Sequence, residues 1–235
     1  MLNSKIWYLQ RINLFKEIPA DDMEELASVT RMEMAKKKET IFLPGESSQQ
    51  VYLLKTGRVK ISRISEEGRE LTLALLEPGE IFGELEILEG SVRDTIAEAM
   101  EESQLCVIQK EQFLSLIRKK PELSFRLTKL IGLRLRRIES RVEDLVFRDV
   151  PSRLAHLLIQ LSEDYGKAMP EGVLLNIKIT HQEMANLIGS IRETVSATLG
   201  EFKKEGLIAF DSRKIIILRP DILKKRIGTT PSSHQ

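Results

Sequence analysis

The residues that point most directly to a chemistry lie near the C-terminus, three and four positions after a glycine. Arg192 and Glu193 follow Gly189 at this spacing, and Ser196 lies one helical turn further on. An arginine can donate two hydrogen bonds to a guanine, and a glutamate can accept one from a cytosine. This arrangement predicts the base-reading end of a DNA-binding helix.

Two short helices separated by that glycine are expected to position these side chains. Thr180 followed by Glu183 matches a capping box, which marks the start of the first helix, and Gly189 marks its end. The second helix is expected to open near Ser190. Two helices joined by a glycine turn predict a helix-turn-helix. The apolar residues expected to pack between the helices are Met184, Ala185, Leu187, Ile188, Val195, Leu199 and Phe202.

A β-hairpin is predicted directly after the second helix. Apolar runs at 207–210 and 215–218 flank the polar turn 211–214, whose basic side chains would approach phosphate as a wing. His181 and Gln182 would lie over phosphate as well. For the two helices, a plain helical hairpin without DNA contact is the alternative to a helix-turn-helix. The predicted DNA-binding residues are Thr180, His181, Gln182, Ser190, Arg192, Glu193, Ser196, Lys203 and Lys214.

A different pattern covers the segment from about Thr40 to Gln112. Short β-rich runs alternate with glycine turns such as Pro44-Gly45 and Pro78-Gly79. Strands at this spacing predict a small β-barrel or sandwich, and no long helix suited to a βαβ nucleotide fold interrupts them. Cys106 falls in an apolar run, so we expect a core residue and not a redox sensor.

A long helix is predicted from about Pro121 to Phe147. Its apolar residues recur at steps of three and four, as in a coiled-coil seam, with arginines beside them. Packing on its own barrel is the alternative, but the narrow stripe favours self-association. The predicted dimer interface consists of Leu127, Ile131, Leu135, Ile138, Val142 and Leu145.

A helix break at 149–152 is expected to separate two domains. A further helix is predicted from Arg153 to about Tyr165, then a loop at 166–172, then a second small α/β domain from Val173 to about Arg226.

Composition excludes several classes of protein. The 235 residues carry a formal net charge of +1, one cysteine and three histidines, and all three histidines come after position 150. A single cysteine cannot form a disulfide within the chain or hold a zinc ion or an iron–sulfur cluster by itself. The barrel has no histidines to bind a metal or haem. A cupin-like enzyme is disfavoured, and no metal or cofactor is expected. With no secretory signal and no apolar run near the roughly 20 residues of a membrane helix, a cytoplasmic location is expected.

The chain resembles the Crp–Fnr superfamily of bacterial transcription regulators over about residues 10–222. The matching motifs are Pro44-Gly45, Gly57-Arg58-Val59, Pro78-Gly79-Glu80, Phe82-Gly83-Glu84-Leu85, Arg148-Asp149-Val150 with Ser152-Arg153, and Gly189 with Arg192-Glu193-Thr194-Val195. The resemblance implies an α+β fold with an N-terminal β-roll (double-stranded β-helix), a long dimerisation helix and a C-terminal winged helix-turn-helix. The corresponding segments are 1–119, 120–147 and 148–227, followed by a disordered tail at 228–235.

This resemblance implies a homodimer that binds an inverted repeat in double-stranded DNA and contacts RNA polymerase as an activator. Arg192 and Glu193 match the base-reading positions of the family, and Ser196 matches a position that helps to set specificity. Ile191 stands where serine or threonine is usual, and Ala197 where arginine is usual, so the full operator is not implied. A cyclic-nucleotide-binding adaptor without DNA contact is disfavoured by the same motif.

The β-roll of this family holds a small-molecule effector. Cyclic-AMP binders combine a Gly-Glu-Leu turn with an arginine followed by a hydroxyl residue, and add a threonine–serine pair on the long helix. Here Asp94 replaces the hydroxyl and would repel a phosphate, and Ile138-Glu139 replace the pair. We therefore expect that cyclic AMP is not the effector. The candidate pocket residues are Gly83, Glu84, Leu85, Arg93, Asp94, Arg134, Ile138 and Glu139.

Other branches of the family imply other effectors. The N-terminal cysteines of the Fnr branch and a barrel histidine for haem are absent. Regulators of nitrogen control sense 2-oxoglutarate with residues at the positions of Arg93, Arg134 and Glu139, and segment 121–124 is similar to that branch, although Glu84 would oppose a dicarboxylate. Alternatively, the two arginines pair with Glu84 or Glu139 and no effector is required. These alternatives remain open at the level of sequence.

Overall fold

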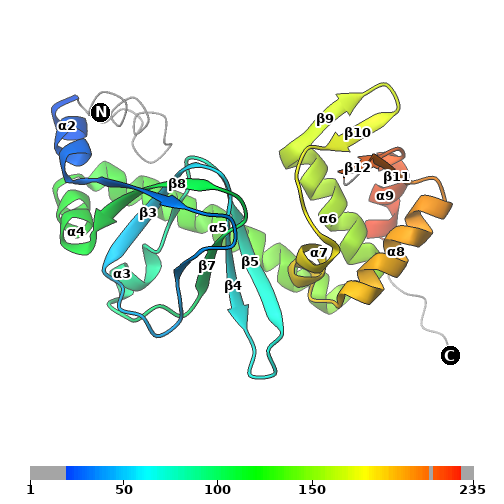
Figure 1. The fold of residues 1–235 in the computed structure, drawn as a ribbon, viewed down its shortest axis with the longest axis horizontal. Coiled ribbons are helices and arrows are strands. Elements are labelled where there is room, and N and C mark those ends of the chain that lie inside the picture. Colours follow the sequence, from blue (N-terminus) through cyan, green and yellow to red (C-terminus); the bar gives the residue numbers. More distant parts are fainter. Residues whose placement is uncertain (1–19, 212–213, 229–235) are drawn as a thin grey trace. The chain divides into compact units, whose positions relative to one another are not determined.

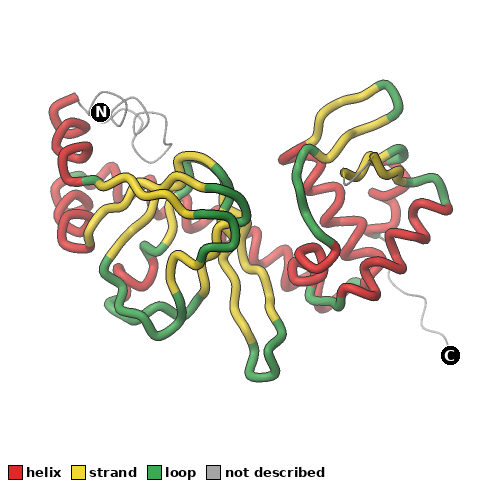
Figure 2. The backbone as a smooth tube through the Cα atoms, viewed as in Figure 1, coloured by secondary structure: helices red, strands yellow, loops and turns green. Residues whose placement is uncertain are grey.

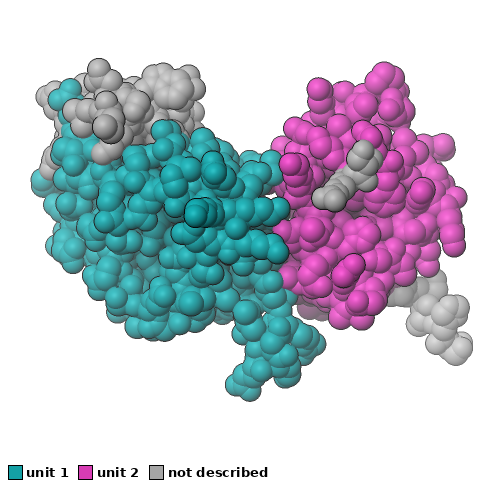
Figure 3. Space-filling model, in the orientation of Figure 1, with its two compact units in different colours: residues 1–134 teal, residues 135–235 magenta. Residues whose placement is uncertain are grey.

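The computed structural model describes residues 20–211 and 214–228, and it divides into two compact units. The first unit comprises residues 1–134 and the second residues 135–235, as Figure 3 shows in two colours. The predicted disordered tail lies outside the described residues, apart from its first residue, and so do the two central residues of the wing turn.

The first unit is a roll of two antiparallel four-stranded sheets (Figure 2). One sheet has the strand order β1-β8-β3-β6 and the other β2-β7-β4-β5, which confirms the predicted α+β class and its β-roll. The strands are β1 (Arg31–Ala35), β2 (Thr40–Phe42), β3 (Gln50–Thr56), β4 (Val59–Ile64), β5 (Glu70–Leu76), β6 (Ile81–Phe82), β7 (Ile96–Ala99) and β8 (Ser103–Gln109).

Helices flank this roll in the first unit (Figure 1). They are α2 (Ala20–Val29), the short α3 (Leu85–Glu89), α4 (Lys110–Lys119) and the start of α5 (Pro121–Phe147). Side chains of α2, α4 and α5 share one apolar cluster with β3 and β8, in which Cys106 is 0% exposed. This burial confirms that Cys106 is a core residue.

The packing of α5 corrects part of the predicted dimer stripe. Leu127 is 4% exposed and belongs to the core of the first unit, and Ile131 packs against the same cluster. Leu127 is therefore used by its own domain, whereas Ile131 is only partly buried there. Leu135, Ile138, Val142 and Leu145 remain exposed, at 53%, 37%, 53% and 43%.

The second unit begins with the C-terminal part of α5 and continues into α6 (Val150–Tyr165). The Asp149 side chain caps α6 by accepting a 2.9 Å hydrogen bond from the backbone N–H of Ser152, and a proline occupies its first turn. α6 therefore starts three residues before the predicted position. Its core-facing side chains Leu154, Leu158 and Leu161 are buried.

The remaining elements of the second unit are a four-stranded sheet and three helices. The predicted loop at 166–172 was partly wrong, because most of it forms strand pairing in the sheet of order β11-β12-β10-β9. Val173 and Leu174 pair with β12 on one side and with β9 on the other, contacts that a local pattern does not reveal. The elements are β9 (Gly166–Met169), β10 (Gly172–Leu175), α7 (His181–Ile188), α8 (Arg192–Lys204), β11 (Ile208–Asp211), β12 (Lys214–Ile217) and α9 (Pro220–Ile227).

Candidate DNA interface and effector pocket

The turn between α7 and α8 has the geometry that the sequence predicts. The Thr180 hydroxyl accepts a 3.1 Å hydrogen bond from the Glu183 N–H, and the Glu183 carboxylate accepts one of 2.6 Å from the Thr180 N–H. Gly189 then ends α7 at φ 62°, ψ 49° in the left-handed region. The capping box and the glycine end of the first helix are both confirmed.

The core between α7 and α8 determines which residues of α8 face outward. Val195, Leu199 and Phe202 are each 0% exposed, and they turn one side of α8 toward α7 and the rest of the unit. Arg192 and Glu193 are exposed on the first turn. The N-cap of α8 is Ile191, so the helix opens slightly later than predicted.

Contacts between polar side chains arrange the rest of the predicted surface. His181 Nδ1 lies 2.7 Å from the Ser196 hydroxyl, which joins the starts of the two helices. Gln182 is exposed and donates a 2.8 Å hydrogen bond to the Asn186 side chain. The structure thus brings together residues fifteen positions apart, and Ser196 is held by a partner that the sequence pattern does not assign.

The basic residues beside the wing are anchored differently. Lys203 places its ammonium 5.8 Å from the centre of the Phe210 ring. Lys214 donates a 2.8 Å hydrogen bond to the side chain of Asn176. The hairpin itself is confirmed, because β11 and β12 are paired antiparallel, with Ile208 opposite Ile217 and Asp211 opposite Lys214.

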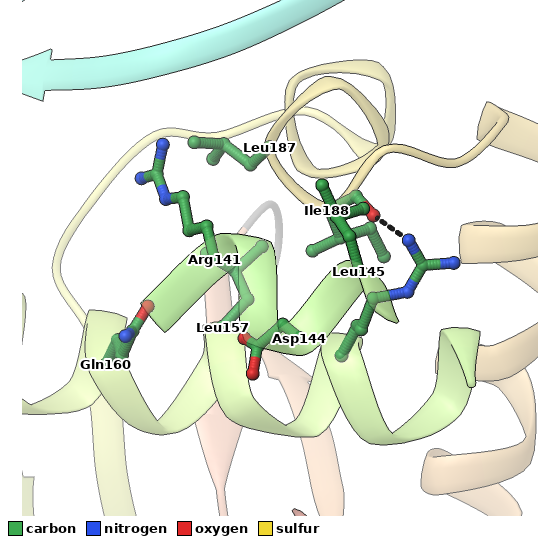
Figure 4. A pocket seen from close by; sticks show the side chains of 8 residues that line it. Arg141, Asp144, Leu145, Leu157, Gln160, Leu187 and Ile188 are labelled. Atoms are coloured by element: carbon green, nitrogen blue, oxygen red, sulfur yellow. Dashed lines mark hydrogen bonds between the residues drawn. The ribbon is translucent and has the colours of Figure 1, made fainter. Parts of the chain in front are cut away.

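A small hollow lies behind the turn, with side chains from α5, α6 and α7 around it (Figure 4). Its volume of about 20 Å³ suits a single water and no larger molecule. At its edge, Arg153 donates a 2.7 Å hydrogen bond to the backbone carbonyl of Ile188 (Figure 4). Arg153 therefore holds one of the carbonyls at the end of α7, which no residue further along that helix can satisfy. The sequence motif included Arg153 without indicating this role.

Gly189 and Gly200 are expected to respond to alanine with opposite signs. A Cβ at Gly189 would lie 2.8 Å from Leu145 Cδ2. The turn would also hold the alanine in the left-handed conformation, which costs about 1–2 kcal/mol. Gly200 lies within α8 with no atom near its missing Cβ, so alanine there is expected to stabilise by about 0.5–1 kcal/mol. Thermal unfolding of the two variants measures both effects. Equal effects would contradict the turn geometry.

In the β-roll, Arg93 is buried and makes three hydrogen bonds to neighbouring groups. It is 2% exposed, and it donates hydrogen bonds to the Gly83 carbonyl at 2.7 Å, to Glu86 Oε2 at 3.0 Å and to the Gln50 carbonyl. Gly83 has φ +74°, and a Cβ there would lie 2.9 Å from the guanidinium. The glycine therefore provides the space that Arg93 occupies. Glu84 and Glu139 were the partners considered for Arg93 in one of the open alternatives; the partner in the structure is Glu86.

Glu84 and Arg134 form a second ion pair. Arg134 donates to Glu84 Oε1 at 3.0 Å and to the Ile81 carbonyl at 2.7 Å, which is one of the pairings that the sequence left open. Glu84 is 1% exposed, and its Oε2 has no hydrogen-bond partner among the described residues. Burial raises the pKa of the Glu84 carboxyl, and the nearby Arg134 charge opposes that rise.

The other predicted pocket residues take no part in these two ion pairs. Asp94 is exposed and forms an ion pair with Arg63, and Leu85 is 47% exposed. Ile138 and Glu139 belong to the second unit. A cavity of about 230 Å³ lies beside Arg93, which is the one predicted pocket residue among those lining it. Its other lining residues are Ile41, Phe42, Glu46, Ser47, Gln49, Gln50 and Tyr52.

Together, the β-roll and the winged helix-turn-helix define a DNA-binding transcription regulator with a sensor-type domain. Residues 32–120 match the family described as the cyclic nucleotide-binding domain, and residues 152–226 match the Crp-like helix-turn-helix domain. The chain belongs to the Crp/Fnr family of transcription regulators.

Several members of the family are similar to most of the chain. A global nitrogen regulator of Synechococcus elongatus is 35% identical over 200 residues, which cover 84% of this chain and 90% of the relative. A CRP-like cAMP-activated global transcriptional regulator of Mycobacterium tuberculosis is 30% identical over 218 residues, 93% of this chain and 97% of the relative. These relatives are transcription regulators, and the chain is not an enzyme.

Solved structures agree with this classification. A CooA mutant from Carboxydothermus hydrogenoformans is 28% identical, with a TM-score of 0.76 and coverage of 93% of this chain and 94% of the other. A CRP/FNR-family regulator from Thermus thermophilus is 30% identical, with a TM-score of 0.71 and coverage of 85% and 100%. Across residues 20–211 and 214–228, no helix is both long and apolar enough to span a membrane.

Proposed function

We propose that the protein acts in the cytoplasm as a homodimer that binds an inverted-repeat operator and activates transcription through contact with RNA polymerase. The observation that carries the DNA-reading part is the turn at Gly189, which places Arg192 and Glu193 exposed on the first turn of α8. The first residues of a recognition helix read base edges in the major groove. Selection of bound sequences from random duplex DNA tests the proposal, and the preferred site should be an inverted repeat containing a guanine in each half.

The rest of the proposed DNA-binding surface surrounds that turn. Thr180, His181, Gln182 and Ser190 lie at the starts of the two helices or in the turn between them. Lys203 and Lys214 flank the wing and are proposed to contact phosphate. Phosphate contacts position the protein on DNA, and the base contacts of Arg192, Glu193 and Ser196 would supply the sequence preference.

The dimer is proposed to form along the exposed part of α5. Leu135, Ile138 and Val142 recur at steps of three and four and leave between 37% and 53% of each side chain exposed. Such a stripe of exposed apolar side chains on one helix is the pattern of a two-stranded seam. The exposed apolar face of α5 supports the proposal that a second copy of this chain covers it. The two-fold symmetry of such a dimer would match that of an inverted repeat.

We propose that the regulator does not depend on an anionic effector. Arg93 and Arg134 are the cationic residues predicted to meet such a ligand, and Glu86 and Glu84 already neutralise them at 3.0 Å. A phosphate or dicarboxylate would have to displace a buried carboxylate from Arg93. The displaced Glu86 carboxylate would then remain buried without its cationic partner, and an unpaired buried charge is costly.

A ligand-responsive regulator is the second candidate function, and one buried oxygen atom favours it. The buried Glu84 Oε2 lacks a partner among the described residues, and a ligand hydroxyl or amide could supply the missing hydrogen bond. The relatives include regulators named for cyclic AMP and for nitrogen control, which leaves a cyclic nucleotide and 2-oxoglutarate as the ligands to test.

Replacing Glu86 by glutamine should create a response to anions that the wild type lacks. The change leaves the buried Arg93 charge uncompensated and is expected to cost about 3–5 kcal/mol of folding stability. Cyclic AMP or inorganic phosphate should then raise the melting temperature of the variant and not that of the wild type. Thermal unfolding and calorimetry with each anion measure this.

Glu89→Gln is the matched control for that experiment. Glu89 lies on the same short helix, is exposed, and contacts only the Ser91 hydroxyl among the interactions described for it. This variant should behave as the wild type does. Wild-type binding of cyclic AMP or 2-oxoglutarate at micromolar concentrations would contradict the effector-independent proposal and support the second candidate.

A further inference from the structure

The most unusual residue at the proposed DNA-reading end is an exposed isoleucine. Ile191 is 59% exposed at the N-cap of α8, directly before Arg192, and its side chain makes no capping hydrogen bond. Serine, threonine, aspartate and asparagine are the favoured residues at that position, because their side chains satisfy a free N–H of the first turn. The chain forgoes that bond and keeps an apolar side chain facing outward.

Packing among the residues that the structure describes leaves most of this side chain uncovered. The next apolar residue of the helix, Val195, is 0% exposed in the core, whereas Ile191 lies on the outward side with Arg192 and Glu193. Its backbone conformation is extended, with φ −105° and ψ 153°, which suits a β-branched residue. The position is therefore well formed, and its apolar surface is left for a partner.

The chemistry of the major groove offers one apolar group to such a side chain. Thymine presents a methyl group at its major-groove edge, and none of the other three bases does. Adjacent Cα atoms are about 3.8 Å apart, close to the roughly 3.4 Å spacing of successive bases. A residue next to a base-reading arginine can therefore reach the neighbouring base pair.

We propose that Ile191 is a specificity-determining residue that contacts the methyl group of a thymine adjacent to the guanine read by Arg192. The inference rests on the proposed base-reading role of α8 and deepens it. Apolar contact replaces the capping hydrogen bond at this position and makes the half-site depend on the methyl group as well as on hydrogen bonding.

Replacing individual thymines of the selected operator by deoxyuridine tests this contact directly. Uracil keeps the base pairing and removes only the methyl group. For the full-length dimer, deoxyuridine beside the guanine is expected to weaken binding about fourfold in one half-site and about fifteenfold in both, from the transfer free energy of one apolar carbon. Substitution at the other thymines should change binding little.

Two variants link the effect to the side chain. Ile191→Ala should bind the thymine and deoxyuridine operators equally, and Ile191→Val should keep most of the discrimination. Melting temperatures near that of the wild type would show that both variants are folded. Discrimination that persists unchanged in Ile191→Ala, or wild-type binding indifferent to every deoxyuridine, would overturn the proposal.

The failure of this inference differs from a failure of the proposed function. If selection yields an inverted repeat whose guanine preference depends on Arg192, while deoxyuridine has no effect, only the methyl contact is wrong. If selection yields no preferred sequence, the base-reading role of α8 fails, and the methyl contact fails with it.

Discussion

Glutamates at both Leu135 and Ile138 are expected to convert the dimer to monomers. The two side chains are 53% and 37% exposed on the free part of α5, where the second copy of the chain is proposed to cover them. Four carboxylates would then enter one apolar seam, and burying unpaired charge costs several kcal/mol. Sedimentation velocity measures the separation, and it should show a species of half the mass.

Loss of the dimer should also weaken operator binding. Two linked half-sites gain about 10²–10⁴-fold in affinity from their second binding event, so the variant should bind the full operator little better than a half-site.

Leu133→Glu supplies the control for the dimer experiment. Leu133 is 51% exposed on the same helix, but it lies five residues before Ile138 and so on nearly the opposite side. This variant should remain dimeric. A dimer of native affinity after the double substitution at Leu135 and Ile138 would place the interface elsewhere.

Arg192→Ala is expected to abolish the preference of the protein for one base in each half of the operator. Each bidentate contact with guanine contributes about 1–3 kcal/mol of discrimination, and a two-fold dimer makes the contact twice. Selected sequences should therefore keep the inverted repeat and lose the preference at one position in each half. Selection with the wild type and the variant in parallel measures this loss.

Lysine variants distinguish base reading from phosphate contact. Lys203→Ala and Lys214→Ala should weaken binding to all sequences alike and reduce the slope of log affinity against log salt by roughly one unit each. If Arg192→Ala behaves in the same way and leaves the preferred sequence unchanged, Arg192 is a phosphate contact and not a base reader.

The helix-turn-helix was predictable because its signals are local. A capping box joins residues three apart, and a glycine in the left-handed region ends a helix through its own backbone, so the segment from Thr180 to Gly189 specifies its geometry almost alone. The strands of the β-roll were predictable for a similar reason, since glycine turns separate short β-rich runs.

The stripe along α5 shows what periodicity leaves undecided. Leu127 and Ile138 occupy the same apolar repeat, yet Leu127 is 4% exposed in the core of the first unit and Ile138 is 37% exposed. A helical repeat defines a face but not what covers each part of it. The position at which α5 leaves its own roll decides which residues of the repeat stay exposed.

The ion pairs of the β-roll were decided by tertiary structure. The family resemblance made Arg93 and Arg134 candidate pocket residues, and pairing with Glu84 or Glu139 was one of the alternatives left open, but Glu86 was not foreseen as the partner of Arg93. The outcome depends on burial, because a guanidinium that is 2% exposed needs the nearest carboxylate and carbonyls that the fold supplies.

By itself, the sequence determined the two-domain order, the turn at Gly189 and the identity of the residues that begin α8. Only the tertiary structure decided that Arg153 holds the Ile188 carbonyl 35 positions away, that His181 contacts Ser196, and that Ile191 remains exposed. The physical reason is range: caps and turns are closed by neighbours in the chain, whereas burial and the partners of buried charges depend on segments that only folding brings together.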